Sequence, residues 1–124
     1  MVSPRTILIV DDEPGIREML AQALRDEGFV VHTAPNGQAA IKLLEQARGY
    51  VVLLDVMMPL LDGYQVLDWL QQAHRQEHHT IILLSAACEL TRVRALLESG
   101  RIACFISKPF DLEHILKLIH SFMA

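Results

Sequence analysis

Three aspartates, a serine and a lysine each follow or end a short apolar run of strand length. They are Asp11, Asp12, Asp55, Ser85 and Lys108. If these runs are neighbouring parallel strands, about 4.8 Å apart, their ends meet at one edge of a sheet and the carboxylates lie close together. At an effective dielectric constant of about 20, each like-charge pair at that distance costs roughly 3 to 4 kcal/mol. The cluster is therefore predicted to need a cation.

The ligand types indicate which cation this is. Carboxylate oxygens without cysteine or histidine favour Mg²⁺, which keeps several waters and is often completed by a phosphate. Lys108 offers a single positive charge on a long stem, suited to holding a phosphoryl oxygen, and Ser85 can donate its hydroxyl to the same group. A carboxylate beside Mg²⁺ and a lysine is a workable nucleophile for phosphoryl transfer. The predicted product is an aspartyl phosphate.

The elements that must position these side chains alternate along the chain. The predicted strands are the apolar runs 7–10, 30–31, 51–54, 81–84 and 102–106. Several are apolar on both faces, which is typical of a central parallel sheet covered by helices. Five strand–helix units with right-handed crossovers predict an α/β, doubly wound sheet, and ligands on such folds bind beyond the carboxyl ends of the strands.

The segments between the strands have helical spacing. Gly28, Gly49 and Gly100 are read as ends of the first, second and fourth helices, and Asp111 as the N-cap of the fifth. The inward residues of the first helix are predicted to be Ile16, Met19, Leu20, Ala23 and Leu24. The second helix spans 39–44, the third 64–73, the fourth 89–99, and the fifth has its inner stripe at Leu112, Ile115, Leu116 and Ile119.

Length and composition limit the class of protein. The chain has 124 residues, of which 52% are hydrophobic and 21% charged, with a net charge of −4. These values predict one domain over residues 1–124 with a single core, and exclude a disordered chain. The apolar runs are far shorter than a membrane span of about 20 residues, and the first residues are too polar for a signal peptide. A cytoplasmic protein that binds neither membrane nor nucleic acid is expected, with Cys88 and Cys104 reduced.

Four motifs stand at the predicted strand ends. They are ILIVDDEP at 7–14, LLDVMMP at 53–59 followed by Asp62-Gly63, LSA at 84–86 and FISKPF at 105–110. In this order they resemble the receiver domain of bacterial two-component response regulators, the CheY-like family, over essentially the whole chain. The resemblance implies a flavodoxin-like fold of five strands and five helices with strand order 2-1-3-4-5.

The resemblance also assigns roles to residues. Asp55 would be the phosphoacceptor, which takes its phosphoryl group from a histidine kinase or a phosphotransfer protein. Asp12 would bind Mg²⁺ directly and Asp11 mainly through water, with Asp55 and the backbone carbonyl of Met57 as further ligands. Ser85 and Lys108 would contact the phosphoryl oxygens, and Lys108-Pro109 would be a cis peptide.

Signalling in this family is a shift between two states. Ser85 would move toward the phosphoryl group, and the aromatic ring of Phe105 would turn into the space left behind. The face made by the fourth helix, fifth strand and fifth helix would then change, for reading by a downstream output protein or a fused domain. Because Phe105 lacks the hydroxyl of the tyrosine often found there, apolar burial alone would favour its inward state.

Two departures from the family pattern have consequences. The segment 100–105 is one residue longer than usual, and Arg101-Ile102-Ala103-Cys104 stands where members of the family often have an acidic pair. In DNA-binding members this pair supports a symmetric dimer, and its absence argues against that dimer here. Met57 and Ala87 stand where a side chain would orient a water toward the acyl phosphate, and neither can hydrogen-bond to it. Slow autodephosphorylation is therefore expected. Apart from it and self-phosphorylation from small phosphodonors, no enzymatic activity is expected.

Alternative interpretations remain open. The chain could be a pseudo-receiver that acts without phosphorylation, or a Mg²⁺-dependent phosphohydrolase, although Met57 stands where such hydrolases carry a second carboxylate. Asp11 and Asp12 could simply cap a helix, and Phe105 could be only a core residue. Asp62-Gly63 is most simply a turn that starts the third helix. The histidines at 74, 78 and 79 could bind a metal, but a solvated helix end is preferred. Either a single-domain regulator or an excised receiver fits the length.

Overall fold

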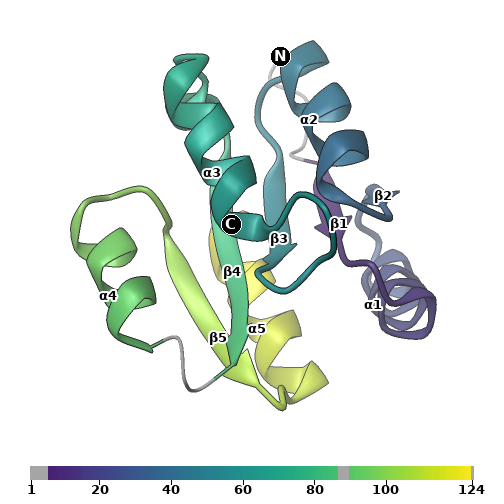
Figure 1. The fold of residues 1–124 in the computed structure, drawn as a ribbon. Coiled ribbons are helices and arrows are strands. Elements are labelled where there is room, and N and C mark those ends of the chain that lie inside the picture. Colours follow the sequence, from purple (N-terminus) through teal and green to yellow (C-terminus); the bar gives the residue numbers. More distant parts are fainter. Residues whose placement is uncertain (1–5, 87–89, 124) are drawn as a thin grey trace.

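The protein is described here by a computed structural model that covers residues 6–86 and 90–123. Its five strands form one parallel sheet in the order β2-β1-β3-β4-β5 (Figure 1). The strands are β1 (Ile7–Val10), β2 (Val31–Ala34), β3 (Val51–Asp55), β4 (Thr80–Ala86) and β5 (Cys104–Lys108). The predicted α/β fold and its strand order are therefore confirmed.

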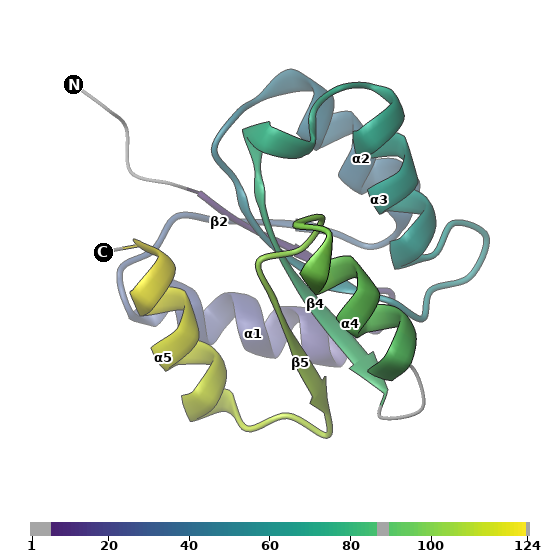
Figure 2. The same cartoon turned by 90° about the vertical axis from the view of Figure 1, so that its left-hand side faces the viewer.

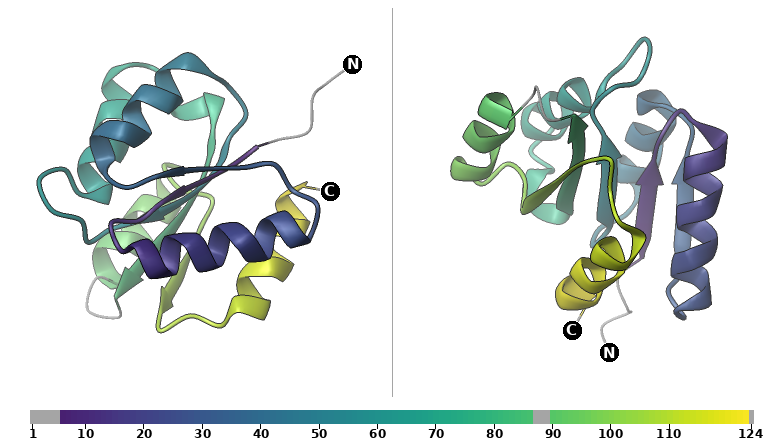
Figure 3. Two further views of the ribbon diagram at one scale, coloured as in Figure 1. Left: turned by 90° about the vertical axis from the view of Figure 1, so that its right-hand side faces the viewer. Right: turned by 90° about the horizontal axis from the view of Figure 1, so that it is seen from below.

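The helices lie on both faces of the sheet. They are α1 (Pro14–Asp26), α2 (Gly37–Gln46), α3 (Gly63–Gln72), α4 (Leu90–Glu98) and α5 (Leu112–Met123), with a short 3₁₀ helix η1 (Gln76–His78) before β4. Helices α1 and α5 cover one face, and α2, α3 and α4 cover the other (Figures 2 and 3). None of the helices in the described ranges is long and apolar enough to span a membrane.

The core is divided by the sheet because successive side chains of a strand point to opposite faces. Leu8 and Val10 of β1 belong to the core cluster that includes residues of α2, α3 and α4, while Ile7 and Ile9 belong to the one that includes residues of α1 and α5. Every residue of β1 and of β3 is buried, including Asp55. Helices on both faces explain why these strands are apolar throughout.

Polar residues begin three of the helices. The Asn36 side chain accepts a hydrogen bond from the Ala39 amide at the start of α2. Asp62 and Gln65 form a reciprocal capping box at the start of α3, so the predicted turn at Asp62-Gly63 is confirmed. Asp111 accepts from the Glu113 amide before α5, as its predicted N-cap role requires.

Some predicted boundaries and faces are wrong. β2 spans Val31–Ala34 instead of 30–31, because its pairing with β1 begins at Val31, and β5 runs two residues further along the chain than 102–106. The register pairs Ala86 of β4 with Lys108, which makes that lysine the last residue of β5 instead of part of a loop. In α1, Met19 is 45% exposed and Ala21 takes the inward place, because the helix faces the sheet through Leu20, Ala21 and Leu24.

Candidate functional site

The carboxylates gather where β1 and β3 end. The register pairs Val10 of β1 with Leu54 of β3. Asp11 follows Val10 and Asp55 follows Leu54, so the two aspartates stand side by side at neighbouring strand ends. Carboxylate oxygens of Asp11, Asp12 and Asp55 all lie within 4.8 Å of one another. Asp11 and Asp55 are buried, and Asp12 is exposed. The cluster predicted from the strand ends is therefore formed.

Asp11 is held with one oxygen free. Its Oδ1 accepts a hydrogen bond of 2.9 Å from the Glu13 amide, and its backbone carbonyl accepts one of 2.8 Å from Arg17 Nη1. Its Oδ2 is buried without a hydrogen-bond partner among the described residues. A buried carboxylate oxygen without a donor is costly, and a cation would remove that cost. The donor set, all hard oxygens, fits Mg²⁺.

Capping does not account for the aspartate pair. The N-cap residue of α1 is Glu13, and no side chain caps this helix. Only one oxygen of Asp11 is used locally, by the Glu13 amide, and Pro14 at the helix start removes one amide that would need a partner. The second oxygen of Asp11 is left for another ligand.

Asp55 is paired with Lys108. Lys108 Nζ lies 2.7 Å from Asp55 Oδ1, although the two residues come from strands on either side of β4. Burial raises the pKa of the Asp55 carboxyl, while the hydrogen bond and the charge of Lys108 act in the opposite direction, and the charge of Asp11 adds to the rise. The long stem of Lys108 thus delivers a cation to an otherwise desolvated carboxylate.

Ser85 lies at the same sheet edge but apart from this ion pair. It is 2% exposed and is paired in register with Ser107 of β5, one step beyond the Asp55–Leu84 pair. No hydrogen bond joins its hydroxyl to Asp55 or Lys108 in the described part of the chain. The strand order places the Ser85 hydroxyl at the sheet edge that carries Asp55, but the hydroxyl does not hydrogen-bond to the Asp55 carboxylate.

The loop after β3 and the strand β5 carry the other predicted site residues. The Met57 amide donates to Asp55 Oδ1 at 3.4 Å, while the Met57 side chain is 64% exposed. Phe105 is half-buried and packs against the core under α2, α3 and α4. The Lys108-Pro109 peptide is cis, as the resemblance implied. Ala87 lies outside the described residues.

Two positions near the site were missed by the sequence reasoning. A Cβ at Gly63 would lie 2.7 Å from the Asp55 carbonyl oxygen and 2.9 Å from Val56 Cα, so only glycine fits there. Gly63 had been read only as a turn residue, although a glycine at a helix start beside the site was a usable signal. Arg17, which holds the Asp11 carbonyl, gave no signal because a hydrogen bond to a backbone carbonyl leaves no motif.

The histidine interpretation is wrong for His79. The ring is only 8% exposed, with Nδ1 accepting from the Tyr50 amide at 3.2 Å and Nε2 donating to the Leu44 carbonyl at 3.1 Å. Both nitrogens are thus used inside the fold, so His79 is neither a solvated residue nor a metal ligand. Burial lowers its pKa below the usual histidine value.

Cys104 matches the prediction of a reduced thiol. It is a free cysteine, and burial raises its pKa to about 11, so the thiol stays protonated at neutral pH. Cys88 lies outside the described residues, and its state stays a prediction.

Comparisons with known proteins agree with this geometry. The family model of the response regulator receiver domain matches residues 7–120. Response regulator Rre1 of Synechocystis is 35% identical over an alignment that covers 100% of this chain and 54% of that protein, so the chain spans about half of that relative.

Two solved structures have the same fold. A CheY-like receiver domain protein from Methanospirillum hungatei has a TM-score of 0.83 and 30% identity, with 98% of this chain and 95% of that one covered. The regulator TrrA of Thermotoga maritima, solved with Mg²⁺ and BeF, has a TM-score of 0.75 and 31% identity, with 94% and 97% covered. The chain belongs to the receiver domains of two-component response regulators.

Proposed function

We propose that Asp55 accepts a phosphoryl group from a histidine kinase or a phosphotransfer protein. The observation that carries this proposal is the buried Asp55, paired with Lys108 at 2.7 Å, beside the two other carboxylates of the cluster. In a structural neighbour, TrrA, a receiver of this fold was solved with Mg²⁺ and BeF. Phosphorylation of Asp55 would be the input that this domain passes on by protein contact.

Mg²⁺ would be held by Asp11, Asp12, Asp55 and the backbone carbonyl of Met57. The unpartnered Asp11 Oδ2 supports this assignment, because a cation would meet an oxygen that now has no donor. Bound Mg²⁺ would supply positive charge that offsets the three carboxylates and the incoming phosphoryl oxygens. Arg17 and the Glu13 amide hold Asp11 so that its free oxygen keeps its place.

In the transfer itself, one Asp55 oxygen attacks the phosphorus of a phosphohistidine. A P–O bond to Asp55 forms as the P–N bond of the donor breaks, and its electron pair returns to the donor imidazole. Lys108 would leave the carboxylate and hold a phosphoryl oxygen as a point charge, and Ser85 would donate its hydroxyl to another.

The output would follow from a shift in β4, β5 and the helices beside them. Movement of Ser85 toward the phosphoryl group would open space for Phe105, which is half-buried and already packs on the core. The face of α4, β5 and α5 would change and be read by an output protein or a fused domain. We further propose that residues 1–124 act as one receiver in the cytoplasm, with no direct contact to nucleic acid or membrane.

Labelling with acetyl phosphate and Mg²⁺ tests the proposal. We expect one phosphoryl group per chain by intact mass, no label in Asp55→Asn or without Mg²⁺, and full labelling of a remote control, Asp26→Asn. Label that persists in Asp55→Asn would overturn the assignment of the acceptor. An unlabelled wild-type protein would favour a pseudo-receiver, and continuous turnover of a generic phosphate ester would favour a hydrolase.

We also propose that the phosphorylated protein loses its phosphoryl group slowly and turns over no other substrate. Met57 places a thioether where a polar side chain would orient a water, and its side chain is exposed. A lifetime well beyond seconds in Mg²⁺ buffer is expected, and Met57→Glu or Met57→Gln should shorten it. A wild-type lifetime of seconds contradicts the proposal.

A further inference from the structure

Helix α4 is held to the molecule by few apolar contacts. Val93 is the one fully buried residue among its nine, all of which the structure describes, and Leu96 is half-buried. Helix α3 by contrast buries five of its ten residues. Few buried apolar contacts mean a low free energy of local displacement. The polar contacts that hold α4 therefore have more influence on its position.

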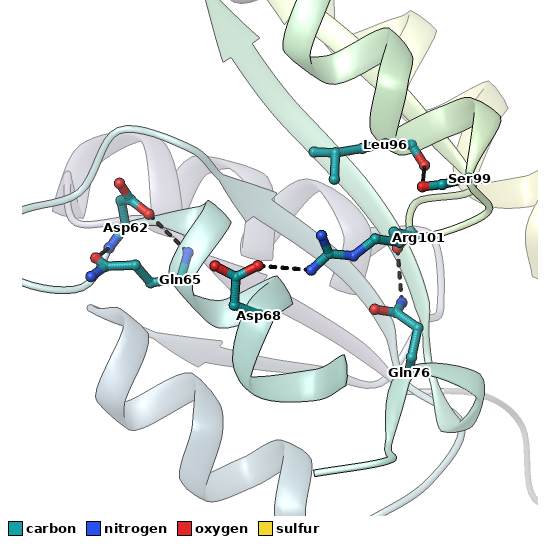
Figure 4. A network of polar contacts seen from close by, with 7 residues as sticks. All are labelled: Asp62, Gln65, Asp68, Gln76, Leu96, Ser99 and Arg101. Atoms are coloured by element: carbon teal, nitrogen blue, oxygen red, sulfur yellow. Dashed lines mark hydrogen bonds and ion pairs between the residues drawn. The ribbon is translucent and has the colours of Figure 1, made fainter. Parts of the chain in front are cut away.

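The carboxyl-terminal end of α4 is fixed. Arg101, just after the helix, makes an ion pair of 2.9 Å with Asp68 of α3, and its carbonyl accepts a hydrogen bond of 2.8 Å from Gln76 Nε2 (Figure 4). Its amide donates to the Leu96 carbonyl, which closes the end of the helix. Asp68 and Gln76 thus anchor this end to α3 and to the segment that follows it.

The amino-terminal half of α4 is held by a different contact. The guanidinium carbon of Arg92 lies 3.5 Å from the centre of the Tyr64 ring, at the start of α3. Arg92 is exposed, whereas Tyr64 is only 5% exposed, so the guanidinium covers a face of the ring that would otherwise meet water. A cation over an aromatic ring is attracted by the ring's quadrupole. We call this the Arg92–Tyr64 contact.

The backbone next to Tyr64 is fixed to the end of β3. The preceding Gly63 lies against the backbone of Asp55, where a Cβ would be 2.7 Å from the Asp55 carbonyl oxygen. The Gly63 amide also donates to the Val56 carbonyl at 3.0 Å. The ring therefore stays with the end of β3, and displacement of the amino-terminal half of α4 would break the contact.

We propose that the Arg92–Tyr64 contact restrains α4 in its unphosphorylated position and so sets the phosphorylation response of this receiver, an inference that rests on the proposed function. The structure has Asp55 paired with Lys108, the arrangement of the unphosphorylated site. A contact present in this state and lost in the phosphorylated state lowers the population of the latter. The apparent affinity for a phosphoryl group, or for its analogue, falls by the same factor.

Affinity for beryllium fluoride in excess Mg²⁺ tests the proposal, measured by calorimetry on the full chain. Arg92→Met and Tyr64→Leu should each bind it roughly two- to fivefold more tightly than the wild type, the factor that such a contact at an exposed site represents. The double variant should gain no more than either single one. Arg94→Met is the matched control, because Arg94 is exposed, on the same helix, and without an ion pair or ring contact in the described residues.

Hydrogen exchange without Mg²⁺ or beryllium fluoride separates this proposal from the proposed function. Amides of residues 94–97, which donate to the carbonyls of the first turn of α4, should exchange faster in Arg92→Met than in the wild type, while those of β3 stay unchanged. Failure of the wild type to bind beryllium fluoride would overturn the proposed function, and with it the regulatory role. Wild-type binding with equal or weaker affinity in Arg92→Met, an equal gain in Arg94→Met, or unchanged exchange in α4 would each overturn the restraint alone.

Discussion

The strands β1 and β3, at whose ends the carboxylate cluster lies, and the elements α4 and β5 are built in opposite ways. All residues of β1 and β3 are buried and packed on both faces, while α4 buries one residue and β5 only Ile106. The first region fixes three carboxylates within 4.8 Å. The second contains Lys108 and lies beside Ser85, and its helix α4 is held by one buried residue and by polar contacts. The carboxylate cluster and the face that we propose to change thus lie in different parts of one sheet.

The largest expected effect is a difference in the stability lost when a leucine is truncated in β3 or in α4. Leu53→Ala in β3 should lower the free energy of unfolding by about 2 to 5 kcal/mol, because it leaves a cavity in a fully packed core. Leu96→Ala in α4 makes the same change at a half-buried position and should cost about 1 kcal/mol. Urea unfolding measures both values. Equal losses would show that α4 is as firmly packed as β3.

Gly63→Ala tests the junction between the regions. The added Cβ would meet the Asp55 backbone at 2.7 Å, which cannot move without shifting β3, so a loss of about 1 to 3 kcal/mol and weaker Mg²⁺ binding are expected. Gly15→Ala is the control, since a Cβ there has nothing within 4 Å and lies in a helix, where alanine is favoured. A Gly63→Ala protein with wild-type stability and Mg²⁺ affinity would contradict the close approach.

A pH series tests the hydrogen bonds of His79, which lies near the start of β3, opposite the end that carries Asp55. Since burial lowers the pKa of His79, the unfolded chain binds a proton more readily than the folded one. This contribution to stability is complete above pH 6.5 and is lost as the pH falls below 6.5 toward the lower folded value. Unfolding at pH 7 and pH 5 should show a smaller difference in His79→Leu than in the wild type. The exposed His74→Leu should keep the wild-type difference, and a matching decrease there would refute the assignment.

The smallest effect belongs to the ion pair at the end of α4. Arg101→Met should cost less than about 1 kcal/mol, because Asp68 is 57% exposed and water screens the pair. Its consequence should be local, with faster amide exchange at residues 96–100 and none in β1. Salt at 0.5 M should remove most of the difference between this variant and the wild type. A loss of several kcal/mol would mean that the end of α4 is held as firmly as β1 and β3.

How much of this could be predicted depends on what kind of contact was involved. Apolar runs on both faces of β1 and β3 predicted the parallel sheet, and from that the meeting of Asp11, Asp12 and Asp55. Strand β5 was placed two residues early because an apolar run shows which residues are buried, not which pair. Ile102 is buried yet lies before the strand.

Contacts between polar groups that lie far apart in the sequence could not be predicted. His79 bonds to Tyr50 and Leu44 through backbone groups, and Arg92 stacks on a ring 28 positions earlier, so neither leaves a local pattern. The ion pair of Asp55 with Lys108 was expected only as a meeting at one sheet edge. The structure adds that the ammonium group of Lys108 contacts the Asp55 carboxylate directly.

Lys108 has a second consequence because β5 is an outer strand of the sheet. An outer strand presents unpaired amides and carbonyls to which another chain can add. On β5 the charged Lys108 and the following Pro109 oppose such addition. Replacing Lys108 with an apolar residue would therefore do more than remove a charge from Asp55. It would also favour self-association along β5.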